Sequence, residues 1–185
     1  MRKQYKPPKN IIFMEYQNNE FESKNFKDTN FTGENFSNSS FMNCTFENCN
    51  LSNINVTNTK FHGTKFVNCK ILGVNFSKCN NFILNFNFSK CLISTSIFSN
   101  LNLKSMKFTD CQINDSDFEN NNLTYSSFEK SDFKNTIFNK NNLSFASFKD
   151  ATNYTINTNN NIIKKAKFSA SQALNLLDSF DIEIV

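Results

Sequence analysis

Six cysteines and one histidine carry the most reactive side chains of this 185-residue chain: Cys44, Cys49, Cys69, Cys79, Cys91, Cys111 and His62. A zinc site needs several thiolates or imidazoles that converge from short, characteristic spacings. The sequence has no C-x-x-C pair, and the cysteines are mostly separated by multiples of five residues. The spacing therefore predicts no metal site and indicates that something other than metal binding positions these residues.

Catalytic chemistry has equally little support. One histidine, three glycines and no nucleophile motif leave neither a general-base pair nor a phosphate-binding loop. We therefore predict a protein that is not an enzyme and has no cofactor.

Large apolar residues recur at every fifth position, a period that fits neither an α-helix nor a single β-strand. Eighteen of the 23 phenylalanines lie in this register. It runs without a gap from Phe21 to Phe76 and again from Phe88 to Phe148, fails at Asn153 and Thr158, and resumes at Ile163 and Phe168. We call each of these apolar positions a centre.

A smaller residue usually stands two positions before each centre, and all six cysteines fall at this place. For Cys79 the centre would be Asn81. The other positions are mostly polar, so each unit directs one large and one small residue inward. Cys49 and Cys69, like Cys91 and Cys111, are 20 residues apart and should stack within disulfide reach. We nevertheless expect free thiols, because we predict a cytoplasmic protein and disulfides are rare in the reducing cytoplasm.

The pattern resembles the pentapeptide-repeat family, as in "CTFEN", "CNLSN", "SDFKN" and "ASFKD". The resemblance covers roughly residues 14–168 and implies an all-β fold, a right-handed quadrilateral β-helix with four pentapeptides per coil. Centres 20 residues apart should then stack about 4.8 Å apart. The expected columns are Phe21–Phe41–Phe61, Phe26–Phe46–Phe66, Phe98–Phe118–Phe138 and Phe108–Phe128–Phe148.

The register predicts three parts: a flexible basic arm over residues 1–10, the β-helix over 11–168, and a C-terminal module over 169–185. Phe76 and Phe88 are two residues further apart than the repeat allows, so the β-helix has a break at 77–87. Phe82, Ile83 and Leu84 lie together in this break. Two interpretations stay open: the three side chains are tucked into the core, or they form an exposed apolar contact site.

The C-terminal residues change from five-residue to helical spacing. Ser169 or Ser171 can cap a helix that carries Ala173, Leu176, Leu177 and Phe180 on one face, and Ile182 and Ile184 alternate as in a short strand. Such a helix caps the open core, pairs with a second copy, or does both.

This tail, with Gln172, Ala173, Leu176 and Leu177, resembles the dimerisation module of the Qnr and MfpA proteins, and "NFTGENFSNSSF" is similar to their N-terminal sequence. The resemblance implies a cytoplasmic homodimer that binds DNA gyrase, and also topoisomerase IV, as a DNA mimic and protects it from quinolones. Many Qnr proteins carry two projecting loops. The first has no counterpart in this chain, and only the short break at 77–87 lies near the position of the second. The resemblance assigns partner contacts to that break and to Asp110, Asp115, Asp117, Glu119, Glu129 and Asp132.

Charge leaves two other functions open. The formal net charge is +4, and no acid lies between Asn48 and Thr109, where seven lysines do. Asp110 and Lys130 should stack in adjacent coils and partly neutralise each other. A solenoid of this kind is also a scaffold for an unrelated protein partner, and the lysine-rich coils are typical of direct nucleic-acid binding. No stretch is apolar and long enough to cross a membrane.

Overall fold

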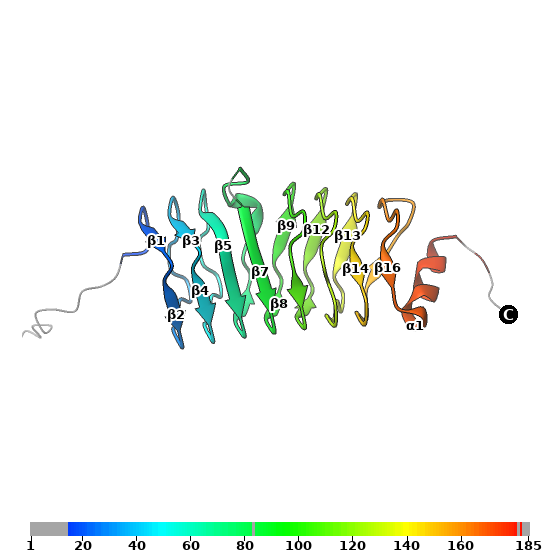
Figure 1. Cartoon of the computed structure of the whole chain (residues 1–185), viewed down its shortest axis with the longest axis horizontal. Helices are drawn as coiled ribbons and strands as arrows, with labels where there is room; N and C mark the ends of the chain where they lie inside the picture. The colour runs from blue at the N-terminus through cyan, green and yellow to red at the C-terminus, as the bar shows by residue number, and fades with distance from the viewer. Residues whose placement is uncertain (1–14, 83, 181, 183–185) are drawn as a thin grey trace, which may run out of the picture.

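The computed structural model describes residues 15–82, 84–180 and 182. They form a stack of about seven coils with the helix α1 at the C-terminal end (Figure 1). The coils wind as a right-handed quadrilateral β-helix, the hand expected for parallel strands joined by crossovers. The predicted fold class is confirmed. The expected arm at residues 1–10 lies outside the described residues.

Short parallel strands from successive coils pair with one another in four sheets. The first sheet contains β1 (Glu20–Glu22), β2 (Asn25–Lys27), β3 (Ser40–Met42), β4 (Thr45–Glu47), β5 (Lys60–Val67), β7 (Leu84–Ser89) and β10 (Phe108–Thr109). The second contains β6 (Lys70–Leu72), β8 (Leu92–Ser94) and β11 (Gln112–Asn114). The third contains β9 (Ile97–Ser99), β12 (Asp117–Glu119), β13 (Ile137–Asn139) and β15 (Thr155–Ile156), and the fourth β14 (Ser147–Phe148) and β16 (Lys167–Phe168).

Each of the four faces of the tube buries one column of centres. Face 1 begins with Phe21, face 2 with Phe26, face 3 with Phe31 and face 4 with Phe36. On face 2 the rings stack from Phe26 to Phe168, with centroids 4.7–5.4 Å apart. All four predicted columns are confirmed; Phe98 and Phe118, for example, are 4.6 Å apart and nearly parallel. Stacked rings thus fill the core.

The chain turns most corners of the square through a residue with positive φ. Such residues recur at the second position after a centre, as at Asn38, Asn43, Asn48, Asn53 and Asn58, with φ between 53° and 58°. Asparagine and glycine tolerate this left-handed conformation better than most residues, and all three glycines of the chain adopt it. The corners therefore account for part of the asparagine content of the sequence.

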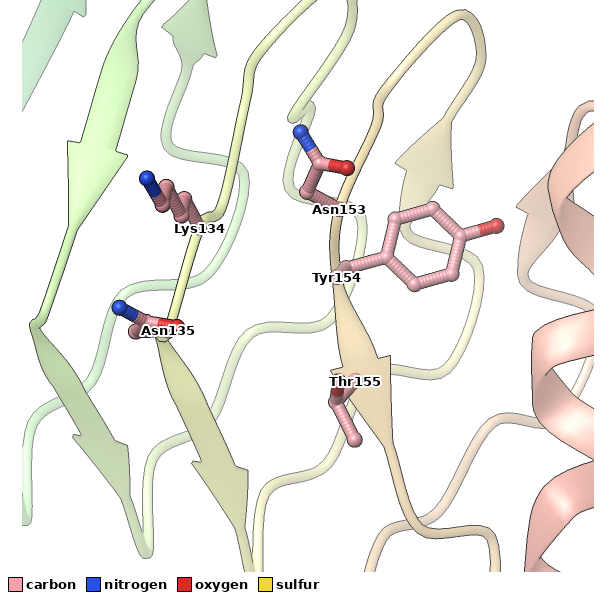
Figure 2. A pocket seen from close by; sticks show the side chains of 5 residues that line it. All are labelled: Lys134, Asn135, Asn153, Tyr154 and Thr155. Atoms are coloured by element: carbon pink, nitrogen blue, oxygen red, sulfur yellow. The ribbon is translucent and has the colours of Figure 1, made fainter.

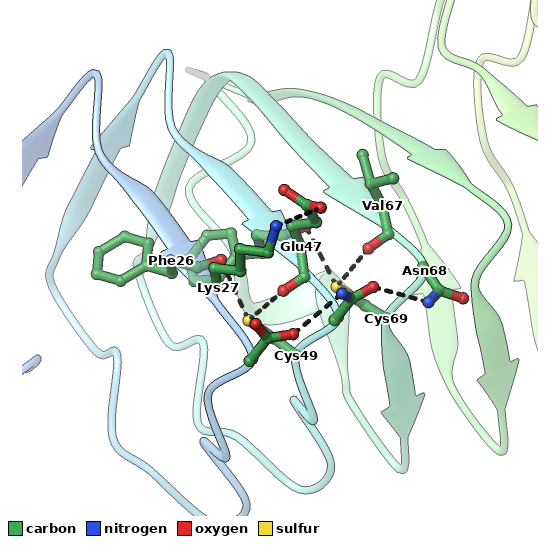
Figure 3. A network of polar contacts seen from close by, with 10 residues as sticks. Phe26, Lys27, Glu47, Cys49, Val67, Asn68 and Cys69 are labelled. Carbon is green, nitrogen blue, oxygen red and sulfur yellow. Dashed lines mark hydrogen bonds and ion pairs between the residues drawn. The ribbon is translucent and has the colours of Figure 1, made fainter.

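Many side chains at the small inward position donate to backbone carbonyls. The Cys49 thiol donates to the carbonyls of Phe26 and Glu47 at 3.3 Å (Figure 3). Cys69 donates in the same way to the carbonyl of Phe46. On face 1, the buried amides of three asparagines donate to carbonyls of the preceding coil at 2.7–2.9 Å: Asn121, Asn141 and Asn161. This position therefore bonds neighbouring coils together.

The predicted break changes the pairing offset between coils from 20 to 22 residues. Phe46 pairs with Phe66, whereas Phe66 pairs with Phe88. A 3₁₀ helix, η1 (Phe76–Lys78), begins the irregular segment, and the Asn75 side chain accepts from the Ser77 amide at its N-terminus. Phe86 pairs with Thr64 and is fully buried, so a phenylalanine occupies a position that elsewhere is small. Its ring supplies core volume that the missing centre at Asn81 does not.

The second irregularity, predicted at Asn153 and Thr158, is met by neighbouring residues. The Tyr154 and Ile156 side chains enter the core instead, and Phe138 pairs with Ile156 at an offset of 18 residues. The offset returns to 20 when Asn142 pairs with Ile162. The side of the coil before β15 is therefore two residues shorter than in the preceding coil. The turn between β15 and Ile162 is two residues longer and restores the register.

Aromatic and helical residues cover the two ends of the described tube. At the N-terminal end, Tyr16 packs against Phe31 and Phe36 with ring centroids 5.1 and 5.4 Å apart. At the C-terminal end, Ser169 precedes a single α-helical turn, α1 (Ala170–Ala173), which continues as the 3₁₀ helix η2 (Leu174–Phe180). The expected helix is thus mostly a 3₁₀ helix.

Candidate partner-binding surfaces

The irregular segment 77–87 presents Phe82 to solvent. Its side chain is 95% exposed. Asn81 anchors the loop beneath it, because the Asn81 amide donates to the Asn100 carbonyl at 2.9 Å and its side-chain oxygen accepts from the Asn102 backbone at 3.1 Å. Phe82 is exposed rather than tucked into the core, whereas Leu84 packs partly against the core, and the contact role of this segment stays a prediction. Ile83 lies outside the described residues.

An open apolar hollow lies beside Phe82. Its volume is about 480 Å³, and its lining residues are Met42, His62, Phe82, Leu84 and Asn85. Met42 and His62 are paired neighbours on β3 and β5, and Asn85 pairs with His62 from β7. The sequence placed His62 at the surface, as observed, but did not connect it to the loop. An apolar side chain projecting next to such a hollow is typical of a protein contact site.

The six predicted acidic contacts lie on two neighbouring coils but divide into two groups. Asp110 stands at the corner between faces 2 and 3, next to the coil that carries Glu129 and Asp132. Asp115 stands at the corner between faces 3 and 4, and Asp117 and Glu119 follow it on β12. The acids therefore wrap around three faces of the tube and do not form a single row.

Amides and hydroxyls, rather than cations, contact these carboxylates. Asn135 donates to Asp115 at 3.0 Å, Asn153 donates to both oxygens of Asp132, and Ser147 donates to Glu129 at 2.8 Å. In the described part of the chain, the one ion pair joins Lys27 to Glu47, at 3.2 Å (Figure 3). Asp110 and Lys130 follow each other along one corner, as expected, and form no ion pair, so their partial neutralisation stays a prediction.

The C-terminal helices present apolar side chains in two directions. Leu176 packs against the end of the core, whereas Leu174, Phe180 and Ile182 are each 56% exposed. Ala173 and Leu177 are partly buried. Ile182 has no regular secondary structure, and Ile184 lies outside the described residues. The sequence did not single out Leu174, because its position is off the helical spacing of the other residues.

The six cysteines are buried and free. Burial raises the pKa of the Cys79 thiol, and the hydrogen bond with Cys111 is the main factor that raises the pKa of Cys91, to about 12. The raised pKa values keep the Cys79 and Cys91 thiols protonated, and protonated thiols are poor ligands and nucleophiles. No group of three or more potential metal ligands occurs among residues 15–82, 84–180 and 182.

A surface depression near the second irregularity is lined by Lys134, Asn135, Asn153, Tyr154 and Thr155. Figure 2 shows the Tyr154 ring pointing away from Lys134 and Asn135. The ring packs in the core, with centroids 5.3 Å from Phe148 and 5.7 Å from Phe168. The Tyr154 hydroxyl is buried without a hydrogen-bond partner, so the depression gains no polar group from it.

Comparison with known proteins agrees with this architecture. "Pentapeptide repeats (8 copies)" match residues 25–58 and 46–80, and "Pentapeptide repeat region" matches residues 80–148. The chain belongs to the pentapeptide-repeat family. No curated protein sequence matches it.

Among solved structures, the fold resembles two trypsin-treated variants of QnrB1, a plasmid-mediated fluoroquinolone resistance protein. They are 15% and 16% identical to this chain, with TM-scores of 0.51 and 0.50. Each match covers 92% of both chains. At this identity the likeness establishes a Qnr-like fold. No helix of the described residues is long and apolar enough to span a membrane.

Proposed function

We propose that this chain is a non-catalytic, cytoplasmic binding protein of Qnr type. In this proposal it binds DNA gyrase, and also topoisomerase IV, and reduces poisoning of these enzymes by quinolones. The observation that carries the proposal is the match to QnrB1 over 92% of both chains, which extends along the whole rod rather than over a few repeats.

The acidic coils supply the electrostatic part of the proposed contact. Asp110, Asp115, Asp117 and Glu119 are exposed, and Glu129 and Asp132 are partly exposed. A basic surface that binds DNA phosphates attracts such carboxylates, so these coils would act as the DNA mimic. The lysine-rich coils between Asn48 and Thr109 then lie outside the contact.

Phe82 supplies the apolar part. A fully exposed aromatic side chain on an anchored loop is the kind of residue that fills a pocket on a partner and dominates its binding energy. The hollow beside it receives a side chain of the partner in return. Because Asn81 fixes the loop on the coil of Asn100 and Asn102, little ordering is needed when the partner binds.

A homodimer completes the proposal. The exposed Leu174, Phe180 and Ile182 form an apolar surface at the C-terminal end, beyond the residues that cap the core. Two copies joined there would place both acidic groups nearer the middle of a longer rod. The residues assigned to this interface are Ala173, Leu176, Leu177, Phe180, Ile182 and Ile184, and we add Leu174.

Binding of immobilised gyrase separates the acidic contact from general charge. The variant Asp115→Asn, Asp117→Asn, Glu119→Gln should bind gyrase roughly tenfold more weakly, because it lacks three carboxylates that in our proposal face the basic surface of gyrase. The control Glu20→Gln, Glu22→Gln, Glu34→Gln removes three exposed acids from the N-terminal coils and should bind like the unaltered protein. Equal weakening by both variants would contradict the assigned contact. Absence of binding by the folded, unaltered protein would favour a scaffold for an unrelated partner.

A further inference from the structure

Two aromatic residues occupy corner positions that elsewhere hold mainly asparagine or other polar residues. Tyr125 and Phe145 stand in adjacent coils at the corner between faces 1 and 2, with φ of 61° and 62°. Bulky side chains seldom adopt this conformation, and such outliers are often found at functional sites. The Tyr125 ring is 55% exposed and the Phe145 ring 37%. Neither is a core centre, so packing of the tube does not account for them.

The two rings form a stacked pair with a lysine over each end. Their centroids are 4.7 Å apart, and their planes differ by 3°. The Lys104 ammonium lies 5.8 Å from the Tyr125 centroid, and the Lys165 ammonium lies 5.7 Å from the Phe145 centroid. The preceding residue of the same corner is Ser105, whose short side chain leaves the adjoining level of the stack without a ring.

More lysines lie on both sides of this corner. Parallel bridges align Lys107, Ser127, Ser147 and Lys167 along the edge of face 2. Lys164 lies on the face 1 side of the corner, in the coil after Phe145, because its backbone carbonyl accepts from the Phe145 amide. The lysines before and after the aromatic pair are thus three coils, or about 14 Å, apart along the rod. The neighbouring Glu129 is only partly exposed and accepts from Ser147.

We propose that this aromatic corner, defined as Ser105, Tyr125 and Phe145 with Lys104, Lys107, Lys164, Lys165 and Lys167, binds single-stranded nucleic acid. One base would stack on Tyr125 above Ser105 and extend the existing pair. Lys104 would move from the ring face to a phosphate, and the other lysines would contact the strand on either side. Exposed rings beside cations are the usual means of binding single strands without sequence preference. A duplex hides the faces of its bases, so it cannot stack a base on Tyr125 and should bind the aromatic corner poorly.

This site adjoins the proposed gyrase contact at Glu129 but shares no residue with it. The acidic residues lie on faces 2, 3 and 4, whereas Ser105, Tyr125 and Phe145 stand at the corner between faces 1 and 2. It is also separate from the lysine-rich coils before Thr109, apart from Lys104 and Lys107, which both groups share.

Anisotropy of a fluorescein-labelled, mixed-sequence single-stranded oligonucleotide, measured with this protein alone at about 50 mM salt, tests the proposal. We expect binding that weakens steeply with salt. Tyr125→Asn with Phe145→Asn should lower the affinity roughly tenfold or more. Asparagine suits the left-handed corner, so the melting temperature should not fall. Tyr125→Phe keeps the ring and should bind normally.

Lys60→Gln with Lys70→Gln is the matched control, because it removes two lysines from the central coils and leaves the corner intact. This control should keep its affinity. The proposal is overturned if the oligonucleotide does not bind, if the asparagine variant binds like the unaltered protein, or if the central-coil control loses as much affinity. It is also overturned if the duplex of the same sequence binds more tightly.

Discussion

The left-handed corner residue connects the composition of this chain with its fold. Asparagine tolerates positive φ, and its side chain also bonds to the next coil: Asn68 donates to Asn48 at 2.7 Å, and Asn120 donates to Asn100 at the same distance. An exposed position thereby contributes to coil stacking. The requirement is conformational, and so lysine, serine, threonine and aspartate occur at other corners.

Tyr154→Phe should stabilise the protein, because it removes a buried hydroxyl that has no partner and keeps the ring between Phe148 and Phe168. The expected gain is about 1 kcal/mol in the free energy of unfolding. Urea denaturation followed by circular dichroism measures it. Lower stability of the phenylalanine variant would show that the hydroxyl is bonded in solution.

At the scale of elements, the break at 77–87 shows what a repeat pattern predicts. The two extra residues between Phe76 and Phe88 located the break from the sequence alone. Its conformation depends on the volume left in the core when Asn81 replaces a centre. Several coils enclose that volume. In the sequence, Phe82, Ile83, Leu84 and Phe86 are all apolar candidates to fill it. Local spacing therefore could not identify Phe86 as the buried residue.

Phe86→Ala and Phe82→Ala form a matched pair that tests this packing. Phe86 is fully buried, so its truncation should cost about 3–5 kcal/mol of stability through lost contacts and a cavity. Phe82 is 95% exposed, and its truncation should change stability by no more than about 0.5 kcal/mol. Thermal or urea unfolding compares them. Similar losses for both variants would mean that Phe82 is packed in solution.

The C-terminal helices combine a cap with the proposed interface, and substitutions can separate the two. Leu174→Asp with Phe180→Asp should convert the proposed dimer into a monomer of nearly unchanged stability, because both side chains are exposed. Leu176→Asp should lower the melting temperature, because Leu176 packs against the core. Light scattering and thermal unfolding give the two readouts. A dimer that survives Leu174→Asp with Phe180→Asp would remove this surface from the interface.

At the scale of the whole molecule, the repeat made most of the fold predictable. Period five identified the centres and the small inward positions, and four units per coil gave the pairing of Phe118 with Phe98 and Phe138. The candidate contacts were less predictable. Asp110 lies beside the coil that carries Glu129 and Asp132 only because successive coils overlap, whereas Asp115 stands at the far edge of face 3 from Asp110. The position of an acid in the five-residue repeat predicts the face on which it lies. Which acids become neighbours depends on how successive coils stack.

Charge is distributed unevenly around and along the rod. Lysines occupy the middle coils and the aromatic corner, while acids surround faces 2 to 4 of the coils from Asp110 to Asp132. A net charge of +4 therefore coexists with six acids on two neighbouring coils. Proposed gyrase binding relies on that local surface, and so it should respond to the position of acids more than to net charge.

Supercoiling by DNA gyrase in the presence of ciprofloxacin, with the purified protein titrated in, tests the central claim most directly. The proposal predicts that supercoiling is restored as the protein is added and is inhibited at higher concentrations, since the protein then competes with DNA. Protein with Asp115→Asn, Asp117→Asn and Glu119→Gln should need a higher concentration for both effects. Neither rescue nor inhibition by a folded dimer would contradict the proposed function and leave the Qnr-like fold without a topoisomerase partner.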